Sequence, residues 1–414
     1  MTRDDMIGWF GPLFLLGLNA LIMFWLIVTS GAIFPLLALG DGAELDAATR
    51  GRLRLLLLPS LALAPLLLIM RLRAIVSLAL RNTSLMILVI WAAISIVWSI
   101  APELTGRRAF GLVVNTTIAC YLVVDRDVDK LLRMLAWCFL ILMIANAAFI
   151  VGLPDLAKMP DGRGIRGAFL HKNSVGETAV IGQIVFYAAL RSGAVSRPVG
   201  LLGMALSLGL LVIAGAASSI VVGAAILGLQ LYFLTDVLAF RQRAVIFAFG
   251  LAACIVVAGV LFANIEDFLG ALGRDTTLTG RTDIWAYVIK VSAQRPWLGY
   301  GYAGFFESTQ IAQYMQDAYQ WSIPTAHNGY LEMVLGLGWI GFALLLTFFL
   351  VVTYRLTVNW QSLPIGVRLL ALPMLIYYIL LNFTESTILA SSGLGWLVMV
   401  IAALLLTPGL SVED

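Results

Sequence analysis

The chain contains only two histidines, and each stands where a polar connection gives way to a long apolar run. His171 is followed by Lys172 and Asn173, and His327 is followed by Asn328. Imidazole is the side chain best suited to take up and release a proton near neutral pH. The two histidines are therefore the first candidates for acid–base chemistry, although a single histidine near a helix start is more often structural than catalytic.

Arginines accompany both histidines in the sequence. Arg163 and Arg166 precede His171, and Arg281 belongs to a run at 280–285 that lies between the two histidines. Guanidinium groups match phosphate oxygens in a bidentate geometry, and exposed N–H groups at a helix start add to such a site. A single arginine at a membrane surface often meets only lipid headgroups. As a cluster, however, these arginines predict a site for an anionic phosphate group.

Acidic residues also lie at positions that a membrane makes costly. Glu177, Glu332 and Glu385 fall at or within the outer ends of predicted spans, where ionisable groups are often functional. They could equally serve only as partners of the arginines. The three cysteines all lie inside apolar runs, where cysteine behaves as a small hydrophobe. We therefore expect no disulfide framework, no metal site and no cofactor.

The composition indicates what kind of element positions these side chains. Hydrophobic residues make up 61% of the 414 and charged residues only 12%, whereas soluble domains have about 25% charged residues. Apolar runs of roughly 20 residues, the length that crosses a bilayer, recur from end to end. The sequence thus predicts an all-α polytopic membrane protein, a single integral membrane domain over residues 1–414. The net charge of +3 is too small to indicate a nucleic-acid partner. The predicted spans are 12–38, 54–70, 83–99, 107–124, 131–153, 174–190, 198–214, 216–235, 244–263, 327–353, 368–386 and 392–408.

The connections between spans bear on how the chain crosses the membrane. With both termini in the cytoplasm, nearly every inner connection holds arginine or lysine, in agreement with the positive-inside rule. The outer connections also hold bases, among them Arg50, Arg52 and Arg274, so charge alone leaves the orientation open. A smaller connection at 154–172 and a large one at 264–326 lie on one face, because an even number of spans separates them. The polar candidates gather on that face.

The large connection has a helical pattern of its own. Residues 282–294 place Ile284, Trp285 and Val288 on one side, which predicts a helix lying along the membrane surface. The run 296–304, rich in glycine, ends it, and a second helix is expected at 307–319. A start signal at 324–325 then places His327 in the first turn of the tenth span. There the positive end of the helix dipole would favour a neutral imidazole.

At these motifs the chain resembles the superfamily of O-antigen ligases and Wzy-type O-antigen polymerases. The resemblance is sharpest in Arg-Gly-x-Phe-x-His-Lys-Asn at 166–173, Gly-Arg-x-x-x-Trp at 280–285, Pro-x-x-Gly-x-Gly at 296–301 and His-Asn-Gly-Tyr-Leu-Glu at 327–332. The order and spacing of the motifs fit as well, and the resemblance covers most of the chain. His-Lys-Asn at 171–173, together with Asn-Phe-Thr-Glu-Ser at 382–386, is most similar to the exopolysaccharide-production polymerase branch.

The resemblance implies a GT-C-like glycosyltransferase of the bacterial inner membrane, with about a dozen spans and one large helical periplasmic loop. It implies an inverting, metal-independent transfer from a glycan on undecaprenyl diphosphate, with both long connections in the periplasm. The reactive histidine of the family maps onto His327, and its diphosphate-binding arginines map onto Arg281 and onto Arg163 or Arg166. Supporting positions are His171, Lys172, Asn173, Asn328, Tyr330 and Glu385.

More than one function fits this resemblance. The leading interpretation is a polymerase that transfers a growing chain onto the non-reducing-end sugar of another lipid-linked repeat unit. A ligase would instead transfer finished polysaccharide to lipid A core or another acceptor. A transporter or flippase of lipid-linked sugars predicts charges or broken helices near the bilayer midplane, often in repeated halves, which the sequence does not show. The expected partners are the undecaprenyl-diphosphate-linked donor, a glycan or lipid acceptor and the bilayer, with a chain-length regulator and a flippase as further candidates.

Overall fold

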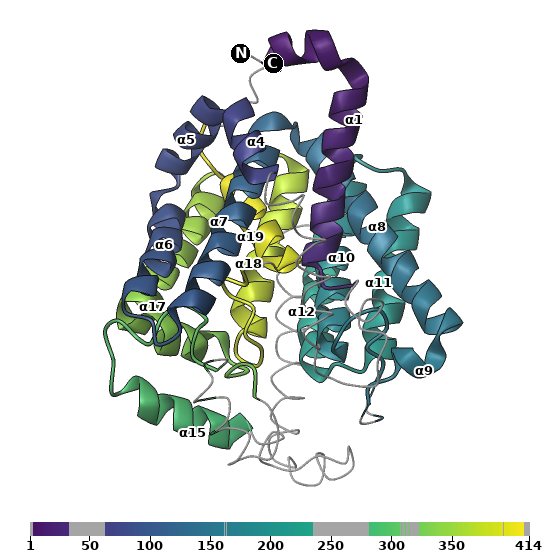
Figure 1. Cartoon of the computed structure of the whole chain (residues 1–414). Coiled ribbons are helices and arrows are strands. Elements are labelled where there is room, and N and C mark those ends of the chain that lie inside the picture. Colours follow the sequence, from purple (N-terminus) through teal and green to yellow (C-terminus); the bar gives the residue numbers. More distant parts are fainter. Residues whose placement is uncertain are drawn as a thin grey trace.

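The computed structural model describes residues 3–32, 63–160, 162, 164–234, 281–306, 308, 311, 314, 323–391 and 393–409. In this part of the chain the regular secondary structure is helical, apart from one isolated bridge between Lys158 and Ile165. Figure 1 shows the helices assembled into one bundle. They are α1 (Arg3–Thr29), α4 (Leu63–Met70), α5 (Leu72–Arg81), α6 (Thr83–Ile94) with a short 3-10 turn (Ser95–Val97), α7 (Pro102–Asp125), α8 (Val128–Gly152), α9 (Pro154–Ala157), α10 (Lys172–Ser192), α11 (Arg197–Ala214), α12 (Ala217–Leu234), α15 (Arg281–Ser292), α17 (Gly329–Val358), α18 (Ile365–Leu381) and α19 (Leu394–Leu404).

The helix lengths and compositions confirm a polytopic helical membrane protein. Among the described residues, α7, α8, α11 and α17 are long and apolar enough to cross a membrane, and the bent pair α4 and α5 gives a fifth candidate. Several of the remaining helices are apolar but shorter. The count of twelve spans therefore stays a prediction. The predicted ninth span at 244–263 lies outside the described residues.

The two ends of the bundle contain different polar clusters. Figure 1 shows α15 and α9 at one end and the start of α1 at the other. At the end opposite α15, the Asn82 amide donates to Thr407 at 3.0 Å and accepts from the Arg355 guanidinium. This polar cluster joins the turn before α6 to the ends of α17 and α19. The predicted site lies at the other end of the bundle, near α15.

One helix stands where the sequence predicted only a connection. The predicted spans at 54–70 and 83–99 leave residues 71–82 as an inner connection, but α5 occupies 72–81 and is bent by 93° from α4. Its buried side consists of Ile75 and Leu78, while Leu72 and Leu80 are exposed. Ten residues are too few to span a bilayer, so the segment gave no span signal. Its amphipathic pattern is nevertheless sufficient for a helix that packs on α7.

Helix α10 packs among four other helices and carries the first polar motif at its N-terminal end. It packs against α8, α11, α12 and α18, and its residues between Val175 and Ala189 are nearly all buried. The Gln183 amide donates to Gln230 of α12 at 3.1 Å, and the Tyr187 hydroxyl donates to the Gln230 carbonyl at 2.8 Å. Such bonds satisfy polar groups that lipid cannot, and they join helices within a membrane. α10 is therefore a fixed support for Asn173.

The large connection contains the predicted helix, but its apolar side faces protein. α15 runs from Arg281 to Ser292, close to the predicted 282–294. Ile284 and Val288 are buried against a cluster that includes Phe305 and Leu335, so this side does not face the lipid surface as expected. Of the helix expected at 307–319, only residues 308, 311 and 314 are described, and the connection at 264–280 lies outside the described residues.

The glycine-rich run after α15 docks on α17. Backbone N–H groups of Tyr300 and Gly301 donate to the carbonyls of Leu335 and Gly336, both at 2.9 Å. α17 is interrupted at Gly338, which has φ 68°, and a Cβ there would lie 2.1 Å from the Trp297 carbonyl oxygen. Only glycine allows both this backbone conformation and this close approach. The Pro-x-x-Gly-x-Gly motif is therefore a backbone-to-backbone joint.

Candidate active site

The start of α17 places His327 outside the helix. The Asn328 side chain accepts from the backbone N–H groups of Tyr330 and Leu331, both at 3.0 Å, and so caps a helix that begins at Gly329. The expectation that His327 lies in the first helical turn is therefore wrong. The reason is that asparagine is among the best N-cap residues, so the residue after His327 ends the loop.

The backbone of His327 adopts a conformation that is unusual for a residue with a side chain. Its φ is 49°, in the left-handed region, which costs a non-glycine residue about 1–3 kcal/mol and is concentrated at functional sites. Hydrogen bonds from the neighbouring backbone N–H groups hold this conformation. Ala326 N–H donates to the Glu332 carboxylate at 2.7 Å. Asn328 N–H donates to the Ser386 hydroxyl at 3.1 Å, and Gly329 N–H donates to the Glu385 backbone carbonyl at 2.9 Å. The 326–329 backbone is thereby tied to α17 and to the segment after α18.

Glu385 is the side chain on which the predicted motifs meet. Its Oε1 accepts from the Asn173 amide at 2.9 Å and from the Arg281 guanidinium at 3.1 Å. Its Oε2 lies 3.6 Å from Nδ1 of His327. The carboxylate is buried, with 7% of its side chain exposed. One carboxylate thus joins residues from α10, α15 and the turn before α17, which are far apart in the sequence.

The electrostatic surroundings keep Glu385 ionised. Burial by itself raises the pKa of its carboxyl, but the neighbouring His327 imidazole and the Arg281 guanidinium outweigh it, so the pKa lies below its ordinary value. A buried carboxylate is stable only when it is paired and hydrogen-bonded in this way. Glu385 is therefore a fixed negative charge beside the histidine.

Arg281 is held by two acceptors at the first position of α15. One guanidinium nitrogen donates to the Thr384 carbonyl at 2.5 Å and another to Glu385 at 3.1 Å. The side chain retains 19% exposure, and that of His327 retains 21%. Both groups are thus anchored from the protein side while remaining partly accessible to a ligand.

The contact between His327 and Glu385 suggests how the imidazole is used. A distance of 3.6 Å exceeds a hydrogen bond, so the contact is an ion pair when the imidazole is protonated. A carboxylate on the Nδ1 side favours a proton on Nδ1 and leaves the lone pair on Nε2. In that tautomer Nε2 can accept a proton from a hydroxyl, and Glu385 then stabilises the imidazolium that forms.

The residues of the 163–173 motif separate into different positions. Asn173 reaches Glu385, whereas His171 caps α10 by accepting the Asn173 N–H at 3.1 Å. Lys172 packs beside Gly164. Arg166 is half-buried and donates to the Leu156 carbonyl at 3.1 Å. Within the described contacts it does not touch Arg281, His327 or Glu385, and Arg163 lies outside the described residues.

Tyr330, another of the predicted supporting residues, connects two helices. Its hydroxyl donates to the Ile379 carbonyl at 2.7 Å, and its ring centroid lies 5.1 Å from that of Phe383. These contacts join the start of α17 to the end of α18. Tyr330 therefore fixes the two segments that carry His327 and Glu385.

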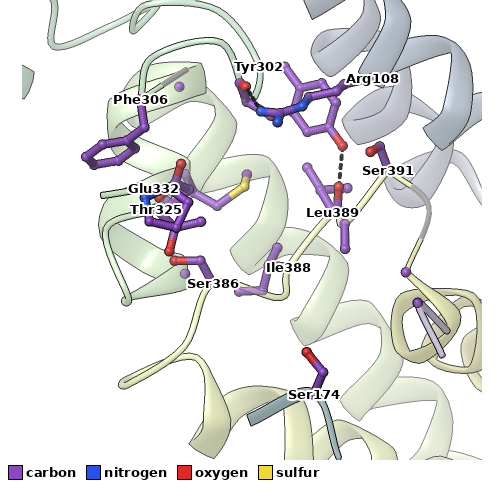
Figure 2. Close-up of a pocket in the computed structure, with 18 of the residues that line it drawn as sticks. Arg108, Ser174, Tyr302, Phe306, Thr325, Glu332, Ser386, Ile388, Leu389 and Ser391 are labelled. Carbon is purple, nitrogen blue, oxygen red and sulfur yellow. Dashed lines mark hydrogen bonds between the residues drawn. The ribbon is translucent and has the colours of Figure 1, made fainter. Parts of the chain in front are cut away.

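A cavity beside this cluster is lined by an arginine that does not belong to any of the motifs described above. The cavity measures about 400 Å³ and is lined in part by Arg108 of α7, Tyr302 and Glu332. Figure 2 shows Arg108 next to Tyr302, whose hydroxyl donates to the Leu389 carbonyl. Burial raises the pKa of Tyr302, and the charge of Arg108 opposes this only in part. Arg107 and Arg108 lie inside the predicted span at 107–124, and a charge inside a span is the functional signal that could have identified Arg108.

Comparison with known proteins adds to this geometry. Residues 202–346 match the family described as O-antigen ligase (Wzy_C), and this range contains Arg281, the 296–301 run and His327. The chain is also 28% identical over 273 residues to the exopolysaccharide production protein ExoQ of Rhizobium meliloti (strain 1021). That match covers 62% of this chain and 61% of the relative, so the chain spans about three fifths of the length of the relative.

The two matches agree with the motifs that the structure brings together. The family match extends from α11 through the large connection into α17. The 28% identity to ExoQ adds a relative of the exopolysaccharide type. The chain is therefore a multi-pass helical membrane protein whose residues 202–346 are similar to the O-antigen ligase family, with further similarity over 273 residues to an exopolysaccharide production protein.

Proposed function

We propose that this chain is an inverting, metal-independent glycosyltransferase that acts on the periplasmic face of the bacterial inner membrane. Its donor is a glycan linked to undecaprenyl diphosphate. The observation that supports this most directly is the Arg281–Glu385–His327 cluster, in which a phosphate-binding side chain and a proton acceptor share one buried carboxylate. Both face the end of the bundle at which α15 lies.

In the proposed reaction, a hydroxyl of the acceptor attacks the anomeric carbon of the donor sugar from the face opposite the diphosphate. The new C–O bond forms as the bond from that carbon to the phosphate oxygen breaks, and undecaprenyl diphosphate leaves with the electron pair. Nε2 of His327 takes the proton of the attacking hydroxyl. Attack from the back inverts the anomeric configuration, and the Glu385 carboxylate stabilises the imidazolium.

Arg281 is the proposed partner of the leaving diphosphate. A preorganised cation stabilises the negative charge that grows on the phosphate oxygen as the glycosidic bond breaks. Glu385 holds the guanidinium in place before the donor arrives, and the diphosphate must compete with this carboxylate. Arg166 or Arg163 is the second proposed ligand of the donor diphosphate. His171 and Lys172 support that segment.

Polymerisation is the leading form of this reaction, with both donor and acceptor carried on lipid. The similarity to an exopolysaccharide production protein favours it. The family match is described as O-antigen ligase, which keeps transfer to lipid A core or another acceptor as the second candidate. The two reactions share the donor, the base and the inversion, and they differ only in the acceptor.

The deciding experiment uses purified full-length protein with a defined undecaprenyl-diphosphate oligosaccharide, and the products are identified by mass. Longer lipid-linked chains are the expected result and establish a polymerase. Products on an added acceptor lipid establish a ligase. If no glycosidic bond forms with either acceptor, the proposal fails, and movement of intact donor across proteoliposomes would point to transport instead.

A further inference from the structure

The cavity beside the histidine lies where an acceptor would have to be held. Thr325 and Gly329, on either side of His327, line it, as does Ser386, which follows Glu385. Figure 2 shows Thr325 and Glu332 on one side, Arg108 and Ser391 on another, and Ser174 of α10 across from them. Part of the cavity wall is thus built from the same two segments that position the base.

The chemistry of the lining identifies the class of ligand. Hydroxyl-bearing residues recur around the cavity, namely Thr29, Ser30, Ser174, Thr325, Ser386 and Ser391. Arg108 and Glu332 add a guanidinium and a carboxylate, which offer several donors and several acceptors respectively. Phe169, Phe306 and Tyr302 contribute aromatic surface. Alternating hydroxyl groups and apolar ring faces are the properties of a sugar.

Other ligands fit this lining less well. Among the described lining residues Arg108 is the only base and Glu332 the only acid, so the charge balance does not favour a diphosphate, which needs an excess of cations. A polyprenyl tail requires an apolar surface, and burying these polar groups against it would cost free energy. The volume of about 400 Å³ falls within the usual range of small-molecule sites.

We infer that this cavity is the acceptor subsite and that it binds a sugar ring at the end of the acceptor glycan. The inference rests on the proposed function and names the substrate of that site on the acceptor side. Arg108 and Glu332 hydrogen-bond the ring hydroxyls, and the 325–329 turn brings one hydroxyl within reach of His327. The subsite serves a polymerase and a ligase alike, because the acceptor of each is a sugar.

The test measures binding separately from transfer. The probe is the repeat-unit oligosaccharide released from its lipid by mild acid, which can act as an acceptor but not as a donor. Its binding to the purified full-length protein is measured by calorimetry, and its acceptor KM is measured at saturating lipid-linked donor. Arg108→Gln retains an amide for the Ala303 carbonyl, and Arg107→Gln is the matched control because Arg107 is exposed and does not line the cavity.

The expected result is a selective loss on the acceptor side. Arg108→Gln should raise the Kd and the acceptor KM about tenfold, because one hydrogen bond to a charged group contributes about that factor. The donor KM of Arg108→Gln should stay unchanged. Arg107→Gln should leave the Kd and the acceptor KM at their wild-type values. Ser174→Phe should fill the cavity and abolish oligosaccharide binding, whereas Ser174→Ala should not. If Ser174→Phe does not fold, the two arginine variants decide the question alone. Equal Kd values for the wild type and Arg108→Gln would overturn the inference.

Failure of this inference is distinguishable from failure of the proposed function. A wild-type enzyme that forms glycosidic bonds, with an acceptor KM that Arg108→Gln leaves unchanged, removes the subsite and retains the glycosyltransferase. A wild-type protein that transfers no sugar under any condition removes the proposed function, and the inference falls with it. Wild-type transfer together with a selective Arg108→Gln defect supports both.

Discussion

At the scale of single residues, the site depends on one carboxylate with several partners. Glu385 binds Arg281 and Asn173 and lies beside His327, so its charge acts on both the proposed phosphate ligand and the proposed base. Because these contacts share a single group, changes at any partner are expected to be non-additive. Single substitutions therefore need readouts that separate binding from catalysis.

The two histidines should differ strongly in their effect on activity. His327→Ala removes the proposed base and should lower kcat by about 10²- to 10⁴-fold, with donor binding retained. His171 caps α10, and its removal should cost about 1 kcal/mol of stability with a smaller loss of rate. Both purified variants are compared at one donor concentration. An active His327→Ala enzyme, or a reversed ranking of the two, contradicts the mechanism.

Removal of Arg281 should affect the transition state. Arg281→Ala is expected to lower the rate by about 10²- to 10³-fold, the usual cost of one preorganised charge donor. Arg281→Lys should rescue poorly, because the two-pronged contact with Thr384 and Glu385 requires a guanidinium. Lys290→Ala, an exposed change on the same helix, is the control. Near-wild-type turnover of Arg281→Ala at normal expression would show that another residue binds the diphosphate.

Glu385→Gln should separate kcat from KM. The amide no longer orients His327 by charge, so kcat should fall about 10²-fold, as expected for a misplaced catalytic group. Arg281 is released from its carboxylate at the same time, so the donor KM should fall. Steady-state kinetics with the lipid-linked donor provide the measurement. A rise in the donor KM would instead indicate a merely structural residue.

The same variant allows a test of pH dependence. The pKa of Glu385 is depressed in the folded protein, so its charge stabilises the fold above the unfolded value of about 4.3. This contribution should be lost as the pH falls through the lower, folded pKa. The difference in Tm between wild type and Glu385→Gln should therefore shrink between neutral and strongly acidic pH. A constant difference would contradict this assignment.

At the scale of elements, the joint between the 296–301 run and α17 determines where α15 and the start of α17 lie. Backbone bonds from Tyr300 and Gly301 to Leu335 and Gly336 leave no room for side chains between the two segments. Since Arg281 begins α15 and His327 precedes α17, the joint controls the distance between them. The motif glycines therefore act through position.

Substitution of Gly338 should disturb this joint. Gly338→Ala requires φ near 68° and places a Cβ 2.1 Å from the Trp297 carbonyl oxygen, so the run must move away from α17. We expect a destabilisation of at least about 1 kcal/mol, from the backbone strain alone, and a loss of transfer activity. Gly209→Ala is the control because its Cβ meets open space in α11. Thermal unfolding in detergent and the transfer assay measure the two effects, and equal behaviour of both variants would show that the joint is not needed.

At the scale of the whole molecule, the two ends of the bundle have separate roles. The Asn82, Arg355 and Thr407 cluster closes one end, whereas the Glu385 cluster and the cavity lie at the end where α15 packs. The exposed surface between them contains large apolar side chains such as Ile87, Phe110 and Leu350. This belt is the surface that lipid would cover.

The orientation in the membrane can be tested by accessibility. In a background without the three native cysteines, Gln294→Cys after α15 should react with a reagent confined to the periplasm, and Thr357→Cys at the far end of α17 should not. Both positions are exposed in the structure. Reaction of Thr357→Cys in place of Gln294→Cys would reverse the orientation and place the proposed site in the cytoplasm.

The apolar surroundings of the helices and the types of the reactive side chains follow from the amino-acid sequence. Long apolar runs indicate a membrane as the surrounding solvent. In lipid each run must form a helix, because its backbone has to satisfy its own hydrogen bonds there. The two histidines and Arg281 stood out because polar groups are few in such a chain. The helix at 282–294 was predictable for a similar reason, since its apolar spacing is local and appears within one segment.

Which of these side chains act together depends on how helices that are distant in the sequence pack. Asn173 and Glu385 are separated by 212 positions and Arg281 and Glu385 by 104, so no local pattern could pair them. The place of His327 outside the helix depends on competition with Asn328 for the cap, and the cavity around Arg108 depends on the packing of helix ends that are distant in the chain. Local spacing specifies helices and residue types, whereas a shared carboxylate and a lined cavity arise only when separate helices pack.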